Sequence, residues 1–397
     1  MKHFPLLLSI FFFSTLNPLQ AQEQPTDGYT FTTVKAHPVT LIQNQNRTST
    51  CWSFSSLSFL ESELIRLGKG EHNLSEMYVV WYTYLSKADR YVRTDGNINF
   101  APGGGFEDFL YVMKNWGLVP EEAMKGLNYG EEVHVHNELD AVLKAYVDAL
   151  LKNPNGKLST AWKRGVEGIL DAYLGPRPQK FNYKGKEYTP MTFAASLGVN
   201  PDDYISLTSF THHPFYTKFA LEISDNWLWA ESYNIPLDEM MSIFDYAINN
   251  GYTVLWASDV SEIGYSRNGL AVVPETNPDN MSGSDQARWL GLTPAARNAE
   301  LAKMAEKPCK ERVITQEMRQ IAFDNKQTTD DHGMHIFGIA KDQNGKKFYM
   351  VKNSWGESGA YKGIWYVSEA FAAYKTMDIM VHKNAIPAAI KQKLNIK

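Results

Sequence analysis

The sequence predicts a protein of the α+β class, and two local patterns support that prediction. Beginning at Cys51, apolar residues recur at helical spacing from Trp52 to Leu64, which indicates a helix. Near the other end of the chain, the runs HGMHIFGI and FYMVKNSWG flank a turn that contains Asn344 and Gly345. Two strand-like runs around an Asn-Gly turn are typical of a β-hairpin. The chain therefore combines a helical part with a strand-rich part.

Composition and charge fit a well-packed protein without an evident nucleic-acid partner. The chain has 397 residues, of which 44% are hydrophobic and 13% aromatic, and this content is ample for a sizeable core. The length fits either two or three domains or one large domain with insertions. The net charge is −5 and no long basic run is present, so we expect no nucleic acid among the partners.

The first residues have the pattern of a secretory signal. Lys2 precedes an apolar stretch from Phe4 to Leu16, and the small residue Ala21 follows shortly afterwards. The alternative, a membrane anchor, requires a longer apolar run to span a bilayer. We therefore expect residues 1–21 to be a signal peptide that is cleaved near Ala21. The mature protein is expected to be periplasmic or extracellular, without stable membrane association.

Cysteine is used at two positions, Cys51 and Cys309. A single pair is too few for a disulfide framework or for a cysteine-rich structural zinc site. Cys309 lies in a charged, loop-like stretch, whereas Cys51 follows threonines and a serine of the kind that cap helices. In the first turn of a helix, the positive end of the helix dipole favours the thiolate. Cys51 is therefore either a buried packing residue or a nucleophile, and a nucleophile needs a base.

The histidines supply the candidate bases and metal ligands. His134 and His136 could form a metal pair, but no third ligand lies near them in the sequence, so we expect surface residues and no metal site. His212 and His213 precede a proline and indicate a turn. His332 differs from these residues because it opens the predicted hairpin.

Hairpin geometry separates His332 from its neighbour His335. Alternate residues of a strand face opposite sides. An even-length loop pairs residues whose numbers sum to an odd value, which places Asn353 on the face of His332 and His335 on the other face. With the loop centred between Asp342 and Gln343, His332 lies directly opposite Asn353. An odd loop or a β-bulge reverses this assignment.

Asn353 suits a histidine that works as a base. Its side-chain oxygen can accept the ring N–H and hold the imidazole in one tautomer and orientation. Trp355 can shelter that hydrogen bond from water; the alternative is an ordinary hairpin with a core histidine. Acyl transfer also needs N–H donors for the oxyanion. Gln45 can supply an amide beside the Cys51 backbone N–H, and Gln43 is a weaker rival.

Together these segments resemble the papain-like cysteine peptidases, and more narrowly the bleomycin hydrolase / aminopeptidase C branch. The matching motifs are QNRTSTCWSF, DHGM and NSWGE, supported by LSE after the cysteine helix and by GGGF followed by WGLVP. The resemblance implies Cys51 as nucleophile and His332 as general acid and base. It also implies Asn353 as the orienting residue and Gln45 as oxyanion donor, a set that needs no metal or cofactor.

The same resemblance assigns substrate-binding and supporting roles. The substrate-binding residues are Gly103, Gly104, Gly105 and Asp331, and the supporting residues are Trp52 and Trp355. Glycine suits the wall of a peptide cleft because it places no side chain in the way of the peptide backbone. Taken alone, three consecutive glycines are more often a flexible loop.

The resemblance further implies a papain-like two-lobed fold, with a helical lobe, a β-barrel-like lobe and large, mainly helical insertions. His332 lies roughly 280 residues after Cys51, whereas simple papain-like enzymes place it roughly 130–150 residues on. This excess fits a branch-specific insertion at about residues 137–225, inside a peptidase domain of residues 22–397. Beyond the insertion, residues 236–254 indicate a helix that leads into a strand.

The expected function is a thiol aminopeptidase that removes N-terminal residues from peptides. In the branch, a C-terminal arm enters the cleft, but residues 385–397 carry no sign of where they lie. The alternatives are an endopeptidase with an open cleft, an inactive peptide-binding protein of the same fold, and a Cys-His amidase or acyltransferase of another fold. The branch is usually intracellular, so an export signal departs from it. It also forms hexamers, so a homo-oligomer is expected by analogy.

Overall fold

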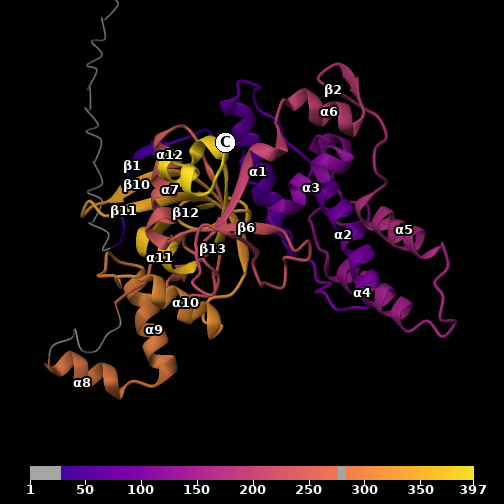
Figure 1. The fold of residues 1–397 in the computed structure, drawn as a ribbon. Helices are drawn as coiled ribbons and strands as arrows, with labels where there is room; N and C mark the ends of the chain where they lie inside the picture. Colours follow the sequence, from indigo (N-terminus) through magenta and orange to yellow (C-terminus); the bar gives the residue numbers. More distant parts are fainter. Residues whose placement is uncertain (1–27, 276–282) are drawn as a thin grey trace, which may run out of the picture.

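The computed structural model describes residues 28–275 and 283–397, which form two lobes (Figure 1). Figure 1 shows helices α2 to α6 on the right and the large sheet on the left, with α1 between them. This is the α+β architecture that the sequence predicts. The predicted signal peptide at residues 1–21 lies outside the described residues.

The helical lobe is organised around α1, which begins at Cys51 as predicted. Every residue of α1 from Trp52 to Leu64 is buried, so the helix runs through the interior between the lobes. Close packing of α1 on β10 depends on small residues: a Cβ on Gly333 would lie 2.8 Å from the hydroxyl oxygen of Ser55. The helices of this lobe are α1 (Cys51–Arg66), α2 (Glu76–Arg93), α3 (Glu107–Trp116), α4 (Asn137–Leu151), α5 (Trp162–Leu174) and α6 (Pro190–Leu197).

The sheet lobe is built on an 11-stranded sheet with β10 at its centre. The strand order is β5-β6-β4-β13-β7-β10-β11-β12-β9-β8, and β1 also pairs with β10. All but one residue of β10 are buried, as expected for a strand covered on both faces. The strands are β1 (Phe31–Ala36), β4 (Tyr204–Thr208), β5 (Lys218–Ala220), β6 (Glu231–Asn234), β7 (Val254–Ser258), β8 (Tyr265–Ser266), β9 (Leu270–Ala271), β10 (His332–Asp342), β11 (Lys347–Lys352), β12 (Ile364–Ser368) and β13 (Thr376–His382).

Several helices cover or extend the sheet lobe. The helix-to-strand order predicted for residues 236–254 is confirmed, since α7 is followed directly by β7. Across the described ranges, no helix is both long enough and apolar enough to span a bilayer. The helices here are α7 (Leu237–Asn249), α8 (Gly283–Gly291), α9 (Pro294–Ala305), α10 (Gln316–Asp324), α11 (Glu369–Lys375) and α12 (Ala388–Lys393).

Residues 137–225 contribute to both lobes. Helices α4 and α5 pack against α2 and against each other, and α6 packs against α3. A small hairpin of β2 (Phe181–Tyr183) and β3 (Lys186–Tyr188) precedes α6. By contrast, β4 lies inside the main sheet between β6 and β13. The segment predicted as an insertion is thus mainly helical, but its last part belongs to the sheet.

The β10–β11 hairpin forms as predicted, but its loop is odd rather than even. Asp342 and Lys346 close the loop, with the Asp342 N–H donating to the Lys346 carbonyl at 3.0 Å, so residues 343–345 make up the loop. Gly345 has a φ of +81°, a left-handed conformation that glycine adopts without strain. The prediction of a loop centred between Asp342 and Gln343 is therefore wrong.

A second irregularity restores the predicted faces of this hairpin. The pairing of β10 with β11 shifts by one residue between Ile336 and Gly338, which is the signature of a β-bulge. The odd loop and the bulge cancel, so His332 and Asn353 share a face and His335 lies on the other. His332 is not directly opposite Asn353, because the pairs in this part of the ladder are offset by two residues from the predicted ones.

The C-terminal tail packs on the outside of the sheet lobe, beside α7. Ile386, Ile390 and Leu394 are buried in the core of that lobe. Lys393 forms an ion pair with Glu239 of α7. Figure 1 shows the C-terminus next to α12 and α7. The structure thereby answers a question that the sequence leaves open.

Candidate active site

Cys51 lines a cleft that has a volume of about 510 Å³ and is walled by both lobes. Thr50 occupies the capping position before α1, and its carbonyl accepts the Ser53 N–H at 2.9 Å. Its hydroxyl bonds to the hydroxyl of Thr48 at 2.6 Å instead of capping the helix. The predicted helix start at Cys51 is confirmed, whereas the expected side-chain cap is absent.

His332, the first residue of β10, lines the same cleft from the sheet lobe. Its Nε2–H donates to Oδ1 of Asn353 at an N···O distance of 2.7 Å. Because an amide oxygen can only accept, this bond fixes the tautomer and leaves a lone pair on Nδ1. Asn353 is itself held, since the Ser354 N–H donates to its Oδ1 at 2.7 Å and its Nδ2 donates to the Tyr265 hydroxyl at 3.3 Å. The imidazole is therefore fixed in both tautomer and orientation.

Trp355 covers the His332–Asn353 hydrogen bond. Its ring stacks on the imidazole of His332 with centroids 4.7 Å apart and an interplanar angle of 28°. Trp365 packs edge-on against Trp355, with centroids 5.4 Å apart. A hydrogen bond sheltered from water is electrostatically stronger than an exposed one. The contact that the sequence proposed for Trp355 is thus present.

Gln45 is anchored to the residue that follows Asn353. The Gln45 N–H donates to the Ser354 carbonyl at 2.8 Å, and the Ser354 hydroxyl donates to Oε1 of Gln45 at 2.6 Å. With Oε1 engaged, the amide N–H groups of Gln45 are the ones able to donate into the cleft. Gln43 instead donates to Asn73 at 3.2 Å on the surface and is not among the cleft-lining residues. The geometry favours Gln45 over its rival.

The predicted glycines form a wall of the cleft before α3. A Cβ on Gly103 would lie 1.8 Å from Oδ2 of Asp225, and one on Gly104 would lie 2.4 Å from Oδ2 of Asp108. Gly105 donates its N–H to the same Asp108 oxygen at 3.2 Å. The wall therefore requires glycine at two positions because two carboxylates approach its backbone closely.

Two other predicted site residues hold neighbouring segments in place. The Trp52 indole N–H donates to the Pro102 carbonyl at 3.1 Å, which fastens the glycine wall to α1. Asp331 lines the cleft, and its Oδ2 accepts the N–H groups of Val260 and Ser261 at 3.2 and 3.1 Å. Its carboxylate thus holds the loop after β7. A direct role of Asp331 in substrate binding stays a prediction.

Burial shifts the pKa values of both Cys51 and His332. It raises the pKa of the Cys51 thiol to about 12, against the opposing effect of backbone N–H groups such as that of Gly333. Burial also lowers the pKa of His332 to about 4, although the hydrogen bond to Asn353 works in the other direction. The helix dipole, equivalent to about half a charge, acts on the thiol in the opposite direction to burial. The thiolate that the helix start favours stays a prediction.

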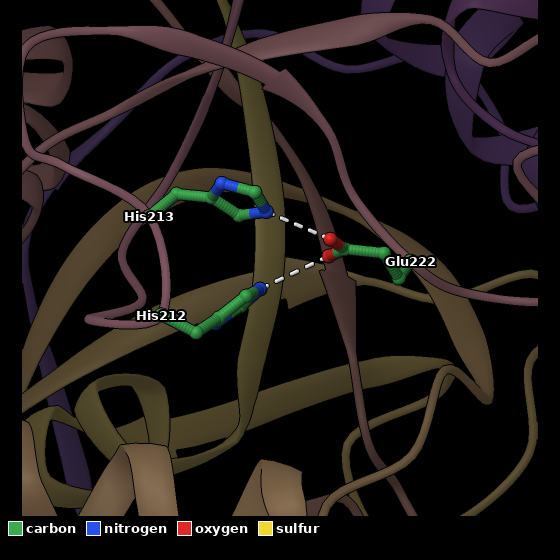
Figure 2. A group of neighbouring side chains, drawn as sticks. All are labelled: His212, His213 and Glu222. Carbon is green, nitrogen blue, oxygen red and sulfur yellow. Dashed lines mark hydrogen bonds and ion pairs between the residues drawn. The ribbon is translucent and has the colours of Figure 1, made fainter.

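One cluster outside the cleft combines metal-ligand types, as Figure 2 shows. Nε2 of His212 and Nε2 of His213 lie 3.0 and 2.7 Å from the two carboxylate oxygens of Glu222. The Gln320 amide nitrogen donates to Asp324 at 2.8 Å and to Nδ1 of His212 at 3.1 Å. An accepting Nδ1 places the proton of His212 on Nε2, where a metal would need a lone pair. This bonding favours a hydrogen-bonded turn over a metal site.

The other histidine pair departs from its prediction. His136 is fully buried just before α4, although we expected it at the surface. Burial lowers its pKa to about 4, and His134 adds to this effect. Backbone bonds explain the burial: the Arg47 N–H donates to the His134 carbonyl and the His136 N–H to the Arg47 carbonyl, which draws the segment against the loop before Cys51.

The sequence of the chain matches a known family. The model of the Peptidase C1-like family matches residues 14–285 and 313–397, which is most of the chain. The chain belongs to the Peptidase C1-like family.

Known relatives of this C1-like peptidase have similar lengths. It is 21% identical to aminopeptidase E of Lactobacillus helveticus over 382 residues, covering 86% of this chain and 81% of the relative. It is also 21% identical to aminopeptidase C of Listeria monocytogenes over 419 residues, covering 94% and 88%. The same identity holds over 425 residues to the mitochondrial cysteine proteinase 1 of Saccharomyces cerevisiae, covering 95% and 81%.

A solved structure bears out the papain-like fold. PepW from Lactobacillus rhamnosis superposes with a TM-score of 0.68 over 92% of this chain and 84% of that chain, at 19% identity. At this identity the likeness concerns the fold alone.

Four cleft carboxylates of this C1-like peptidase escaped sequence reasoning. Glu107, Asp225, Asp330 and Asp378 lie far apart in the chain yet line one cleft. Ser354 and Tyr265, which hold Gln45 and Asn353, were also missed as contacts. The sequence offers no periodic or motif signal for such residues, except that Asp330 and Ser354 each lie beside or near a predicted catalytic residue.

Proposed function

We propose that this cysteine peptidase is an aminopeptidase in which Cys51 is the nucleophile, His332 the proton carrier and Asn353 its orienting partner. The observation that carries the proposal is the 2.7 Å hydrogen bond between His332 and Asn353 in a cleft that Cys51 also lines. Nucleophile, base and orienter are the three parts that covalent acyl transfer requires. Two relatives that bear the name aminopeptidase support cleavage at the amino end of the substrate.

The proposed reaction begins with proton transfer from the Cys51 thiol to Nδ1 of His332. Sγ forms a bond to the scissile carbonyl carbon, and the carbonyl π electrons move to its oxygen. On collapse, the C–N bond breaks and His332 gives its proton to the leaving amine. Water then attacks the thioester with His332 accepting its proton, and the C–S bond breaks to release the acid and restore the thiol.

The oxyanion of both steps needs fixed donors. We assign this role to the side-chain amide of Gln45 and the backbone N–H of Cys51. The Ser354–Gln45 hydrogen bond of 2.6 Å supports this assignment because it leaves the amide N–H groups for the cleft. Preorganised donors of this kind are effective because they need no rearrangement during the reaction.

An endopeptidase is the second candidate, and the C-terminal tail favours it. The tail packs on α7, and within the described chain the cleft lining includes no residue after Asp378. A cleft that the tail does not fill can in principle admit a longer chain. Leu221 and residues 223–226, however, contribute to the cleft wall.

Export completes the proposed function. The signal pattern of residues 1–21 supports removal near Ala21 and action outside the cytoplasm. An epitope-tagged full-length chain, fractionated from its host and sequenced at its amino end, tests this directly.

The deciding experiment for activity compares three fluorogenic substrates under reducing conditions. They are a free aminoacyl-coumarin, its N-acetylated twin and a longer peptide blocked at its amino end. Wild type and Cys51→Ala are assayed side by side. We expect cleavage of the free-amine substrate alone, and its complete loss in the variant.

Other outcomes of this experiment are equally informative. Cleavage of the blocked peptides would replace the aminopeptidase by an endopeptidase with the same chemistry. If no member of a broad side-chain panel is cleaved, the chain is an inactive peptide-binding protein. Full activity of Cys51→Ala would remove Cys51 from the mechanism.

A further inference from the structure

The charges that line the cleft are all of one sign. Among the described residues, five carboxylates line it, together with His332, but no lysine or arginine does. These acids are Glu107, Asp225, Asp330, Asp331 and Asp378. Asp331 already holds backbone N–H groups of the loop after β7. Four more carboxylates line the cleft, of which Glu107 accepts a hydrogen bond from the Ser206 hydroxyl and Asp225 accepts one from Asn99.

Asp378 is the most enclosed of these acids. It lies on β13 with 8% of its surface exposed, and it lines the cleft. Among the described residues its carboxylate makes no hydrogen bond and no salt bridge, whereas buried carboxylates in proteins are nearly always paired. The charge of Arg319 favours the ionised form of Asp378, but the guanidinium donates to the Ser209 carbonyl at 2.7 Å instead of to this carboxylate. The Asp378 carboxylate is thus left without a hydrogen-bond donor at the cleft wall.

Glu107 and Asp330 lie close enough to Asp378 to interact with it. Burial raises the pKa of Asp378, and the charges of Glu107 and Asp330 raise it further. Burial likewise raises the pKa of Asp330 to about 7, with Asp225 adding to the rise. Carboxylates that repel one another in this way are relieved by a cation placed among them.

The acids also lie near the reacting thiol. The charges of Asp330 and Asp225 both oppose ionisation of Cys51. Asp225 is fixed against the Gly103 backbone and accepts a hydrogen bond from Asn99 at 3.2 Å. A cationic group bound among these carboxylates would lie in the same cleft as Cys51.

We propose that Glu107, Asp330 and Asp378, here called the acidic floor, bind a positively charged group of the substrate. The inference rests on the proposed peptidase function and adds a substrate class to it. Two sources supply this chemistry: the α-ammonium of an unblocked peptide, or the side chain of a lysine or arginine near the scissile bond. Charge-assisted hydrogen bonds from such a group to carboxylates are about twice as strong as neutral ones.

The test uses arginyl- and leucyl-aminomethylcoumarin with free amines, each with its acetylated twin. Wild type, Asp378→Asn and Asp330→Asn are compared by kcat/KM per active site, with active sites counted by alkylation of Cys51. An alkylating inhibitor that must bind in the cleft before it reacts counts only folded sites, so misfolded protein and Cys309 do not contribute. Asp238→Asn, an exposed aspartate at the start of α7, is the matched control and should behave as wild type.

Both floor variants should lose about 10- to 100-fold in kcat/KM on cationic substrates, the value of a hydrogen bond to a charged group. Equal loss on the free-amine leucyl and arginyl substrates assigns the floor to the α-ammonium. Loss on arginyl substrates alone, with or without acetylation, assigns it to the side chain. Unchanged kcat/KM on every substrate in both variants would overturn the proposal. Failure of the proposed function looks different, because wild type itself then cleaves none of the substrates.

Discussion

His332 and His335 lie three residues apart on β10 and face opposite sides of the strand. Both are buried, and burial lowers the pKa of both imidazoles. His332 opens onto the cleft with Nε2 bonded to Asn353. His335 is fully enclosed against α1, with Nδ1 bonded to the Ser58 hydroxyl at 3.0 Å. Burial and pKa alone therefore do not mark a catalytic histidine.

The difference lies in what the second ring nitrogen meets. His332 lines the same cleft as Cys51, and in the proposed mechanism its Nδ1 takes the thiol proton. The Nε2 of His335 is buried without a hydrogen-bond partner among the described residues. An unpaired buried nitrogen costs stability. A catalytic histidine therefore differs from a packing histidine in two ways. It lines the same cleft as a reactive group, and a hydrogen bond fixes its orientation.

The largest expected effect comes from removing the imidazole that faces the cleft. His332→Ala should lower kcat/KM by about 10⁴-fold or more, as loss of a triad member does elsewhere. The physical reason is that no other group can take the thiol proton. Steady-state kinetics with the free-amine substrate measure the loss, and circular dichroism checks that the fold persists. A drop below about tenfold would remove His332 from the mechanism.

The second largest effect is expected from removing the proposed oxyanion donor, Gln45. Gln45→Ala should lower kcat by about 10²- to 10³-fold with little change in KM, because the amide acts mainly on the transition state. Gln43→Ala serves as the control, since Gln43 is bonded to Asn73 on the surface. Equal effects of the two substitutions would contradict the assignment.

A smaller effect is expected from the orienter of His332. Asn353→Ala should lower kcat/KM by about 10- to 100-fold, the value of one hydrogen bond to a group that becomes charged. The loss should be smaller than in His332→Ala, because Trp355 still stacks on the imidazole. Kinetics of both variants at several pH values measure the ratio. If Asn353→Ala loses as much kcat/KM as His332→Ala, then His332 cannot act without the hydrogen bond to Asn353.

The enclosed histidine should show the opposite pattern. His335→Ala removes a buried ring between α1 and β10 and should lower the free energy of unfolding by about 2–4 kcal/mol. Per alkylatable Cys51, its kcat/KM should stay within about threefold of wild type. Urea unfolding and active-site titration give both numbers. A large loss of kcat/KM with unchanged stability would mean that His335 acts in catalysis and not in packing.

The smallest effect concerns the pH dependence of that stability. The pKa of His335 is well below its usual range because burial disfavours the charged ring, with Lys352 adding to the effect. In the unfolded chain the pKa of His335 is about 6.5. A depressed folded pKa contributes stability that is present above the unfolded value and is lost as the pH falls below it. The stability gap between wild type and His335→Ala should therefore shrink as the pH falls from about 7.5 to 5.

Much of the fold and of the candidate site could be predicted from local patterns. Helical spacing after Cys51 predicted α1, and alternation along the hairpin predicted the shared face of His332 and Asn353. The second prediction is correct although it missed two features, an odd loop and a β-bulge, whose effects on the strand faces cancel. Local period is a reliable guide, whereas register depends on turn geometry that one Asn-Gly signal does not specify.

Other features could not be predicted because they depend on distant segments. Asp378 comes from the last strand and Asp225 from the segment after β5, and the sheet brings both to one cleft. His136 is buried because a loop near Cys51 pairs with it. The pKa of Cys51 has the same dependence: the helix dipole that favours the thiolate is local, but the desolvation that raises this pKa sums over everything that surrounds the thiol.

The sequence by itself determined the kinds of chemistry available and their order along the chain. Cysteine at a helix start, histidine and asparagine on one hairpin face, and glutamine upstream follow from spacing and residue type. The tertiary structure decided which carboxylates gather around them, where the tail lies, and which protonation states are favoured. The physical reason is that periodicity acts over a few residues, whereas burial and electrostatic repulsion act through space between residues far apart in the chain.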